Sequence, residues 1–433
     1  MKVMSNSLPL KPSIPLSKNR PLIVFGEDWG AHPSSTQHIV KVLGQTRSVI
    51  WLNSIGLRKP KLTVNDLVRL FNKVKSSIVS QPTNNKKSNI KGYINGYKKR
   101  YKKSYKTEVI DNSNFIIINP LVIPCANSWF SLKLSKIILK WQLKLACKKL
   151  AIIDPIIWTS LPTSVDYLEL FGNAPCVYYC GDDFNSLAGV DHQFVSQKEK
   201  ELVEKSSYIF TASEKMLDKF PRNKAVNIPH GVNFSLFSEQ IKKTPCDLPQ
   251  GKPIAGFYGS ISAWLDQDLL VQTIKALPHW HFVFIGKVDC NVDKLQQFST
   301  VYFLGTKPHN DLPKYIQNWN VAMLPFVNNQ QIQMCNPLKL REYLASGTPV
   351  VTTDFNALKG YRKHLQIANE GTPFYQAILL ANAEITPAVN FDKLEKMSDL
   401  LDITQVKKTR KTSVINESWE SRAMDIQRYL VTC

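Results

Sequence analysis

Short apolar runs that alternate with helical segments constrain the fold of this chain more than any other feature. Runs that are apolar at consecutive positions are typical of strands buried on both faces of a parallel sheet. We therefore predict an α/β protein with two Rossmann-like, doubly wound parallel-sheet domains that face each other. The runs are PLIVF, SVIWL, FIIINP, IIW and CVYYC in the first half, and IAGFY, HFVFIG, VYFLG and AMLPF in the second.

A Pro- and Lys-containing segment, KKTPCDLPQGKP, interrupts this alternation near the middle of the chain. Turn-forming residues without apolar periodicity are typical of a linker, so we place the domain boundary there. The predicted organisation is a flexible leader over 1–20, an N-terminal domain over 21–235, a linker over 236–252, a C-terminal domain over 253–415 and a terminal helix over 416–433.

The positive charge is concentrated in one window of the N-terminal domain. The net charge of the chain is +21, and the window from Lys86 to Lys149 holds fifteen Lys/Arg against two acidic residues. Such a local excess indicates a surface that meets an anionic partner. Part of the window, 81–108, is rich in Lys and Tyr, lacks a core pattern and is predicted to be an insertion.

Cysteine usage gives an expectation about metal sites and cellular compartment, and the length of the apolar runs gives one about membrane-spanning helices. The eight Cys show no CxxC spacing and no Cys/His cluster, so we expect no metal site and a reducing cytoplasm. No apolar run approaches the ~20 residues that a membrane-spanning helix needs.

The helix predicted over 129–151 is strongly amphipathic and cationic. Its apolar residues include a Trp, a composition typical of a helix that lies at a membrane surface. The alternative is a domain helix with its apolar side on the sheet and its Lys in solvent. The membrane-surface and domain-helix interpretations are compatible if the apolar side packs on the sheet while a lysine row faces anionic lipid headgroups. That predicted membrane-facing row is Lys133, Lys136, Lys140 and Lys144, and the predicted inward side is Phe130, Leu134, Ile137, Ile138, Trp141 and Leu145.

The segment 336–351, NPLKLREYLASGTPVV, predicts a helix that leads into a buried strand. Asn336 is a good helix N-cap and Pro337 suits the first helical position. The free N–H groups of a helix start at the end of a strand form an anion site. Lys339 and Glu342 share a face of this helix, where Lys suits a phosphate and Glu suits paired ribose hydroxyls. The alternative is an ordinary helix with a surface salt pair.

Polar residues also follow two strands of the N-terminal domain. Asp28, Trp29 and His32 come after the first strand, and Asp182 and Asp183 come directly after CVYYC. Ligands of doubly wound sheets bind at the carboxyl ends of the strands. We therefore expect both groups at the mouth of a cleft, with the aspartates available for chemistry or for hydroxyl recognition.

Several motifs together resemble those of one enzyme family. They are DWGAHPSSTQH, VYYCGDDF, TASEKML and IPHGVN in the first half, and FLGTKPHNDLPKYIQNWNVAMLPF, PLKLREYLASGTPVV and the terminal SWESRA in the second. On these residues the chain resembles the GT-B glycosyltransferases, and more closely the bacterial family 4 type enzymes of cell-surface polysaccharide synthesis.

The resemblance implies a nucleotide-sugar donor held by the C-terminal domain and an acceptor held by the N-terminal domain. It implies catalysis in the cleft, no metal or other cofactor, and a terminal helix that crosses back to the first domain. The family signature has two Glu eight positions apart; Glu342 matches the second, which contacts ribose, and Met334 stands at the first. A basic pair usual near Gly259 is absent. We therefore assign the diphosphate to Lys339 and the backbone of Gly259 and Ser260.

The predicted reaction moves a sugar from a UDP- or GDP-sugar to a lipid-linked or growing polysaccharide acceptor at the cytoplasmic face of the plasma membrane. An inverting reaction needs a general base, for which we favour Asp183 over Asp182. A retaining reaction depends on positioning and on stabilising the leaving diphosphate, chiefly through Lys339. His32, His230 and His309 are expected to be structural.

Two alternatives remain open on the sequence. A sugar-nucleotide epimerase can share the architecture, but it needs neither an acceptor nor a membrane surface, so the basic window argues against it. A nucleic-acid-binding protein could use the basic window at 86–149. That alternative leaves the two-domain cleft unexplained, so no nucleic-acid partner is expected.

Overall fold

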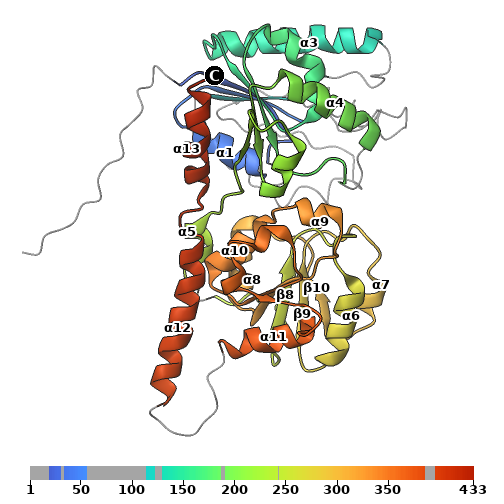
Figure 1. Ribbon diagram of the computed structural model, residues 1–433, viewed down its shortest axis with the longest axis vertical. Helices are drawn as coiled ribbons and strands as arrows, with labels where there is room; N and C mark the ends of the chain where they lie inside the picture. The colour runs from blue at the N-terminus through green and yellow to red at the C-terminus, as the bar shows by residue number, and fades with distance from the viewer. Residues whose placement is uncertain are drawn as a thin grey trace, which may run out of the picture.

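The computed structural model describes residues 19–30, 34–55, 114–121, 129–186, 191–241, 243–385 and 395–433, which form two α/β domains stacked one above the other (Figure 1). Most of the predicted leader, the predicted insertion over 81–108 and His32 lie outside the described residues.

The N-terminal domain is built on a parallel sheet with the strand order β3-β2-β1-β4-β5-β6-β7 in the described part of the chain. Every residue of β1, β2, β4 and β5 is buried, because helices cover both faces. The strands are β1 Leu22–Phe25, β2 Val49–Leu52, β3 Phe115–Ile118, β4 Ile156–Thr159, β5 Cys176–Cys180, β6 Tyr208–Thr211 and β7 Ala225–Asn227. The surrounding helices are α1 Ser35–Leu43, α3 Trp129–Lys149 and α4 His192–Lys205, with the 3₁₀ segments η2 Pro162–Phe171 and η3 Glu214–Lys219.

The C-terminal domain repeats this plan with a second parallel sheet, in the order β10-β9-β8-β11-β12-β13. Its strands are β8 Ile254–Tyr258, β9 His281–Ile285, β10 Val301–Phe303, β11 Val321–Leu324, β12 Val350–Thr352 and β13 Gln366–Ile367. The order reverses direction at the first strand in both sheets, which is the doubly wound arrangement. The predicted fold class is therefore confirmed.

Before residue 395, none of the helices described in the C-terminal domain is longer than ten residues. They are α5 Phe234–Ser238, α6 Gln267–Ala276, α7 Asp293–Gln296, α8 Leu312–Ile316, α9 Gln330–Met334, α10 Leu338–Ser346 and α11 Phe374–Ala383, with the 3₁₀ segments η4 His309–Asp311, η5 Asn356–Leu358 and η6 Arg362–His364. Between the last strand of one sheet, β7, and the first of the other, β8, the described residues form α5 and the loop that contains the predicted linker.

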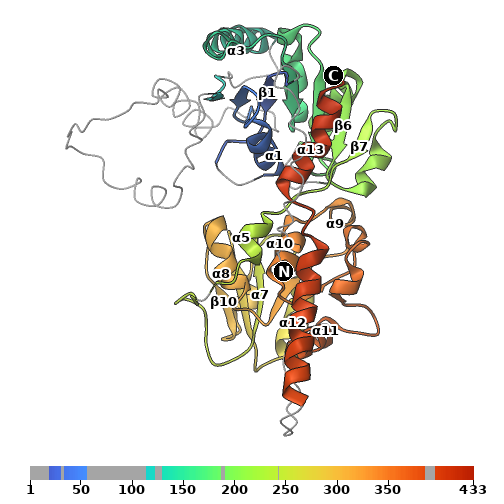
Figure 2. The same cartoon turned by 90° about the vertical axis from the view of Figure 1, so that its left-hand side faces the viewer.

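Two C-terminal helices, α12 Glu395–Ser413 and α13 Trp419–Leu430, run along one side of the molecule and span both domains (Figures 1 and 2). Helix α13 packs against α1, and its apolar side joins the core of the N-terminal domain. The residues that do so are Trp419, Ala423, Ile426 and Leu430. The predicted return of the terminal helix to the first domain is confirmed.

Glu417, at the bend between α12 and α13, ties the two domains together. Its carboxylate accepts hydrogen bonds from Arg341 Nε at 2.6 Å, Arg422 Nη2 at 3.0 Å and the Tyr361 hydroxyl at 2.6 Å. Its carbonyl oxygen also accepts a bond from Val232 N at 2.8 Å, next to a bridge between Val232 and Ser418. The two points where the chain crosses between domains therefore lie side by side.

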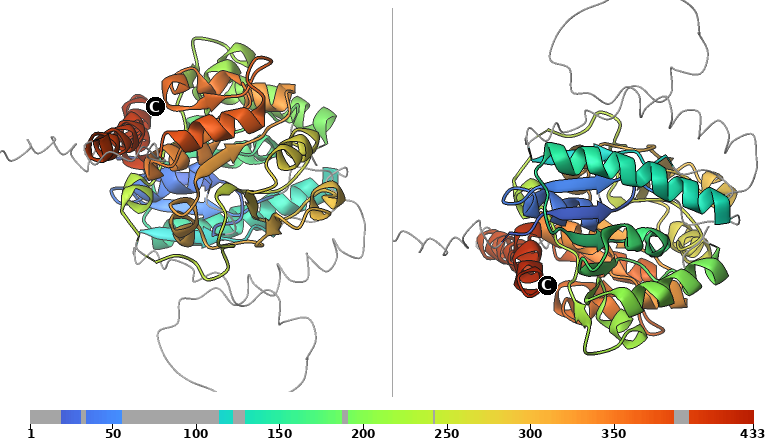
Figure 3. Two further views of the ribbon diagram at one scale, coloured as in Figure 1. Left: turned by 90° about the horizontal axis from the view of Figure 1, so that it is seen from below. Right: turned by 90° about the horizontal axis from the view of Figure 1, so that it is seen from above.

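Helix α3 lies across the outside of the N-terminal domain, on the side remote from the C-terminal domain (Figures 1 and 3). Its buried face is made by Ser135, Leu139, Leu143 and Ala146. The predicted inward packing of Phe130, Leu134, Ile137, Trp141 and Leu145 is wrong, because all five are exposed. The helix carries apolar residues on more than one side, and only one side can rest on the sheet. No helix in the described ranges is long and apolar enough to cross a bilayer.

Candidate active site

The carboxyl ends of both sheets meet at the interface between the domains, and α10 contributes the residues at its centre. Helix α10 begins at Leu338 after Pro337, without a side-chain cap, so the prediction that Asn336 caps it is wrong. Asn336 instead bridges the domains: its Nδ2 donates to the Ala212 carbonyl at 2.6 Å, and its Oδ1 accepts from Arg341 Nη1 at 2.7 Å. Its predicted role in donor binding stays a prediction.

Glu342, on the first turns of α10, is held in place as a carboxylate. Tyr258 donates its hydroxyl to Oε2 at 2.6 Å, and His309 Nε2 lies 2.7 Å from Oε1. Burial opposes ionisation, but these contacts and the charge of Lys339 hold the pKa of Glu342 below its ordinary value. Each carboxylate oxygen has a second lone pair, so Glu342 keeps the capacity to accept hydrogen bonds from two vicinal hydroxyls.

Lys339 lies one turn before Glu342 and points toward the end of β8. Its Nζ lies 5.5 Å from the centre of the Phe257 ring. Within the part of the chain that the structure describes, it forms no ion pair with a carboxylate. Burial lowers its pKa, against the opposing charges of Glu342 and Asp182. An unpaired, partly buried cation at this position is prepared for an anionic ligand.

Gly259 makes room for this lysine. Its φ is +133°, a conformation that favours glycine, and a Cβ there would come 2.8 Å from Lys339 Nζ. The N–H of Gly259 donates to the Ile285 carbonyl at 2.8 Å, so it is not free for the predicted phosphate contact. The predicted contact with the Ser260 backbone stays a prediction. Ser260 donates its hydroxyl to Asp289 Oδ2 at 2.9 Å. The helix that follows this strand, α6, begins at Gln267 with Asp266 as its N-cap.

The adjacent carboxylates Asp182 and Asp183 have different surroundings. Asp183 is buried in the N-terminal domain, where it forms an ion pair with Lys219 and accepts a hydrogen bond from Ser186 Oγ at 2.8 Å. These contacts outweigh burial and lower its pKa. Glu199 lies 3.5 Å from the same Lys219 Nζ. Asp183 is therefore a structural ion-pair partner, and the preference for it as a base is not supported by its position.

Asp182 is exposed, and it lies close enough to Lys339 of the C-terminal domain for the lysine charge to affect its pKa. Desolvation by the surrounding protein raises the pKa of Asp182. The charge of the adjacent Asp183 also raises this pKa, and the charge of Lys339 opposes the rise. Of the two aspartates, only Asp182 has a carboxylate that is both accessible and influenced by Lys339 of the opposite domain. Asp182 is therefore the aspartate whose position suits contact with a ligand between the domains, and its predicted catalytic role stays a prediction.

The loop after β1 is held against neighbouring residues of the N-terminal domain through Trp29 and Asp28. The Trp29 ring packs 4.7 Å from Trp51 and 4.8 Å from Phe115, between ring centres. Asp28 Oδ1 accepts a hydrogen bond from Ser54 N at 3.1 Å. These contacts fix the loop to the neighbouring strands. The predicted acceptor role of Asp28 and Trp29 stays a prediction, and His32 lies outside the described residues.

Two histidines lie near Glu342, one from each domain. The His38 ring stacks on Trp419 with 4.6 Å between ring centres, and it lies 6.3 Å from the His309 ring. His309 was expected to be structural, yet it contacts the Glu342 carboxylate. The loop FLGTKPHN places His309 after β10, but its partner is 33 positions along the chain. Sequence spacing alone gives no signal for this contact.

His230 is a buried, neutral histidine beside the cleft. Its Nδ1 lies 2.5 Å from Ser35 Oγ and 3.3 Å from the Tyr179 hydroxyl. Burial, with the charges of Arg341 and Arg422, lowers its pKa from 6.5 to about 3. The structure therefore assigns it a packing role, as expected from the sequence.

This burial predicts a loss of stability in mild acid. Below its ordinary pKa of 6.5, His230 takes up a proton in the unfolded chain but not in the folded one until about pH 3. The free energy of unfolding should therefore fall by up to about 1.4 kcal/mol for each pH unit below 6.5. Urea unfolding between pH 7 and pH 5 measures this slope. His230→Gln should flatten it, and an equally steep decline in that variant would assign the effect to other groups.

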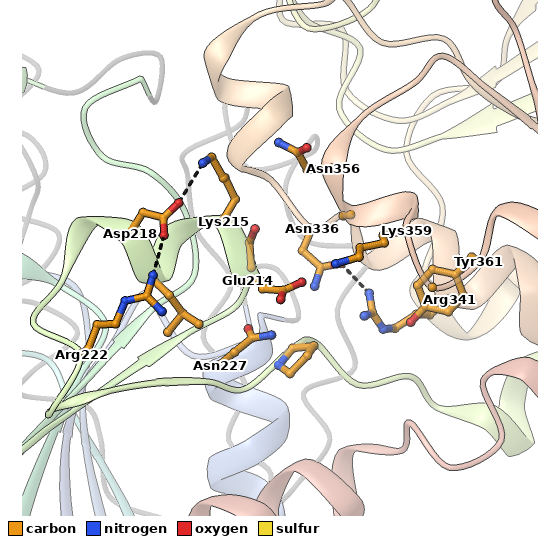
Figure 4. A pocket seen from close by; sticks show the side chains of 15 residues that line it. Glu214, Lys215, Asp218, Arg222, Asn227, Asn336, Arg341, Asn356, Lys359 and Tyr361 are labelled. Carbon is orange, nitrogen blue, oxygen red and sulfur yellow. Dashed lines mark hydrogen bonds and ion pairs between the residues drawn. The ribbon is translucent and has the colours of Figure 1, made fainter.

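A polar cavity of about 770 Å³ also lies between the domains (Figure 4). Glu214, Asp218 and Arg222 line it from the N-terminal domain, and Asn336 and Lys359 line it from the C-terminal domain. Asn227 lines it as well, and its buried Oδ1 has no hydrogen-bond partner. Carboxylates, amides and cations in one cavity suit a ligand rich in hydroxyl groups.

The described residues contain no group of three or more His, Cys, Asp or Glu side chains that could hold a metal ion.

Comparison with known proteins finds one family model that matches part of the chain. Residues 252–380 match the family described as "Glycosyl transferases group 1". A putative teichuronic acid biosynthesis glycosyltransferase, TuaH of Bacillus subtilis (strain 168), is 24% identical over 227 residues. That match covers 48% of this chain and spans 57% of the relative's length.

Solved structures resemble the chain over almost its whole length. A sucrose-phosphate synthase from Thermosynechococcus elongatus has a TM-score of 0.60 at 16% identity, covering 95% of this chain and 98% of that one. HepE of Anabaena in complex with UDP and glucose has a TM-score of 0.58 at 10% identity, covering 96% and 100%. These likenesses confirm the GT-B fold. The family match and the bacterial relative confirm the predicted resemblance to group 1 glycosyltransferases.

Proposed function

We propose that the protein transfers a sugar from a nucleoside-diphosphate sugar, UDP- or GDP-linked, to a lipid-linked or growing polysaccharide acceptor at the cytoplasmic face of the plasma membrane. The observation that carries the proposal is the unpaired Lys339 one helical turn from the ionised Glu342, opposite Asp182 of the other domain. The UDP and glucose in the HepE complex support the donor class. The polysaccharide acceptor is supported by the name of the bacterial relative.

In this reaction the bond between the anomeric carbon and the donor phosphate breaks, and a bond to an acceptor oxygen forms. The leaving diphosphate gains negative charge, which Lys339 is placed to stabilise. The acceptor hydroxyl loses its proton. In an inverting reaction Asp182 takes that proton, and in a retaining one the departing phosphate oxygen takes it. Glu342 holds the ribose so that the diphosphate lies against Lys339.

The polar cavity is the candidate site for the saccharide part of the acceptor. Both domains line it, so a ligand there depends on their closed arrangement. An epimerase has no acceptor and would leave this cavity without a role. Transfer is therefore better supported than epimerisation.

A thermal-shift panel with UDP, GDP, ADP and UDP-glucose tests the donor site. A matching nucleotide at a hundred times its Kd should raise the stability of the folded protein by about 2.7 kcal/mol. Failure of every nucleoside diphosphate to raise the Tm would remove the proposal.

Glu342→Gln should weaken binding of the matching nucleotide about ten- to a hundredfold, because hydrogen bonds from the ribose to a charged acceptor are lost. Calorimetric titration of the nucleotide measures this change. Asp268→Asn, at an exposed carboxylate of the same domain, is the matched control and should bind normally. Normal binding by Glu342→Gln would mean that the ribose is held elsewhere.

A further inference from the structure

Helix α3 presents a continuous apolar stripe to solvent. The stripe consists of Phe130, Leu134, Ile137, Trp141 and Leu145, whose exposed fractions run from 47% to 74%. Their spacing of three or four residues places them on one side of the helix. Surface apolar residues scattered singly need no explanation, but a patch of this size marks an interaction surface. The view from above shows α3 lying uncovered across the domain in the described part of the chain (Figure 3).

All the charged residues of α3 itself are lysines. The sequence of α3 contains no acidic residue, and Lys133, Lys140, Lys144 and Lys148 are exposed along it. Lys136 is the exception among the predicted membrane-facing lysines, because its Nζ forms an ion pair with Glu169 at 2.9 Å. A stripe of Trp, Phe, Ile and Leu flanked by lysines is the composition of a helix that lies in a membrane interface.

An apolar cavity of about 320 Å³ lies beside the second half of α3. Leu143, Ile152, Leu170 and Phe171 line it, together with Lys140 and Lys144. An apolar recess next to two cationic groups fits a lipid, whose acyl chain is apolar and whose headgroup is anionic.

We propose that α3 docks the protein on an anionic lipid bilayer by inserting its apolar stripe, with the flanking lysines on the headgroups. This deepens the proposed function, since it supplies the surface that would hold the enzyme near a lipid-linked acceptor. It reverses the predicted orientation, in which the lysine row alone met the lipid. The C-terminal domain would then lie on the far side of the N-terminal domain, away from the membrane (Figure 1).

Other occupants of the stripe are less favoured by charge. A second copy would bring two lysine-rich helices together, which costs free energy through like-charge repulsion. The chain's own residues 86–106 carry nine Lys/Arg and no acid, so they would also repel the flanking lysines. A bilayer containing anionic lipid is the occupant whose chemistry matches both the stripe and its charges.

Vesicle flotation of the full-length protein tests the proposal without donor or acceptor. The vesicles contain phosphatidylcholine alone or with phosphatidylglycerol, and the protein should float only with the latter. Ile137→Ser/Trp141→Ser/Leu145→Ser should lower the bound fraction about tenfold or more, because three inserted side chains are lost. Leu379→Ser/Leu380→Ser, at exposed apolar residues of α11, is the matched control and should bind normally.

Three outcomes would overturn the proposal. The first is no flotation of the wild-type protein with either vesicle. The second is a wild-type dimer that the triple variant converts to a monomer, which would assign the stripe to a second copy. The third is a wild-type protein that does not float together with a triple variant whose Tm is lowered. This result would mean that the chain's own residues cover the stripe. Donor binding measured in the same triple variant separates a failure of docking from a failure of the proposed function.

Discussion

Lys339→Met is expected to lower the rate of sugar transfer by about a hundred- to a thousandfold. A single group that stabilises charge developing in a transition state contributes on this scale. The methionine has a similar length and fills the space beside Gly259, so the packing of α10 is kept. Steady-state kinetics with the donor identified by thermal shift measure the loss.

The stability of the Lys339→Met variant should not fall with its activity. Burial lowers the pKa of Lys339, which means that the folded protein disfavours its positive charge. Removing the charge should therefore leave the Tm unchanged or raise it, although turnover is lost. A residue kept at some cost to stability is characteristic of a functional site. Lys275→Met, at an exposed lysine of α6, is the matched control, and it should change neither property. Near-normal turnover in Lys339→Met would remove the proposed phosphate contact.

The architecture could be predicted because the strands are short, apolar at consecutive positions and separated by helices. Such strands fit only a sheet buried on both faces, and the two alternating series then give two doubly wound domains. The return of the terminal helix came from the family resemblance, since no pattern in 416–433 specifies which domain it contacts.

Side-chain direction is what the sequence could not supply. Helix α3 has apolar residues on more than one side, and the sheet takes the narrower side made by Ser135, Leu139, Leu143 and Ala146. Periodicity shows that an apolar side exists, but it does not show which side a neighbour covers. The same limit applies to Asn336, which looked like a helix cap and instead bridges the domains through Ala212.

The contacts of Glu342 illustrate a second limit. The residue itself was identified from its position on a helix that follows a strand. Its partners, Tyr258 and His309, come from the ends of two other strands and are far away along the chain. Tyr258 and His309 come close to Glu342 only in the folded sheet, because the strand order brings the carboxyl ends of β8 and β10 near the start of α10.

The two adjacent aspartates are expected to give opposite results when each is changed to asparagine. Asp183→Asn should destabilise the protein by roughly 2 to 4 kcal/mol, because it leaves the partly buried Lys219 with only Glu199 as a carboxylate partner. Asp182→Asn should leave the free energy of unfolding nearly unchanged, because its side chain is exposed. Urea unfolding of both variants measures the difference.

Turnover should follow the reverse order. If Asp182 is the general base, its replacement by asparagine removes a contribution of about a hundred- to ten-thousandfold, measured at a temperature where both variants are folded. Asp183→Asn, once folded, should keep most of its activity, because its carboxylate faces Lys219 and Ser186 rather than the cleft. Full activity in Asp182→Asn, with nucleotide binding intact, would exclude Asp182 as the base. A retaining reaction, in which the departing phosphate takes the acceptor proton, would then be the better account, and Lys339 would remain its main catalytic group.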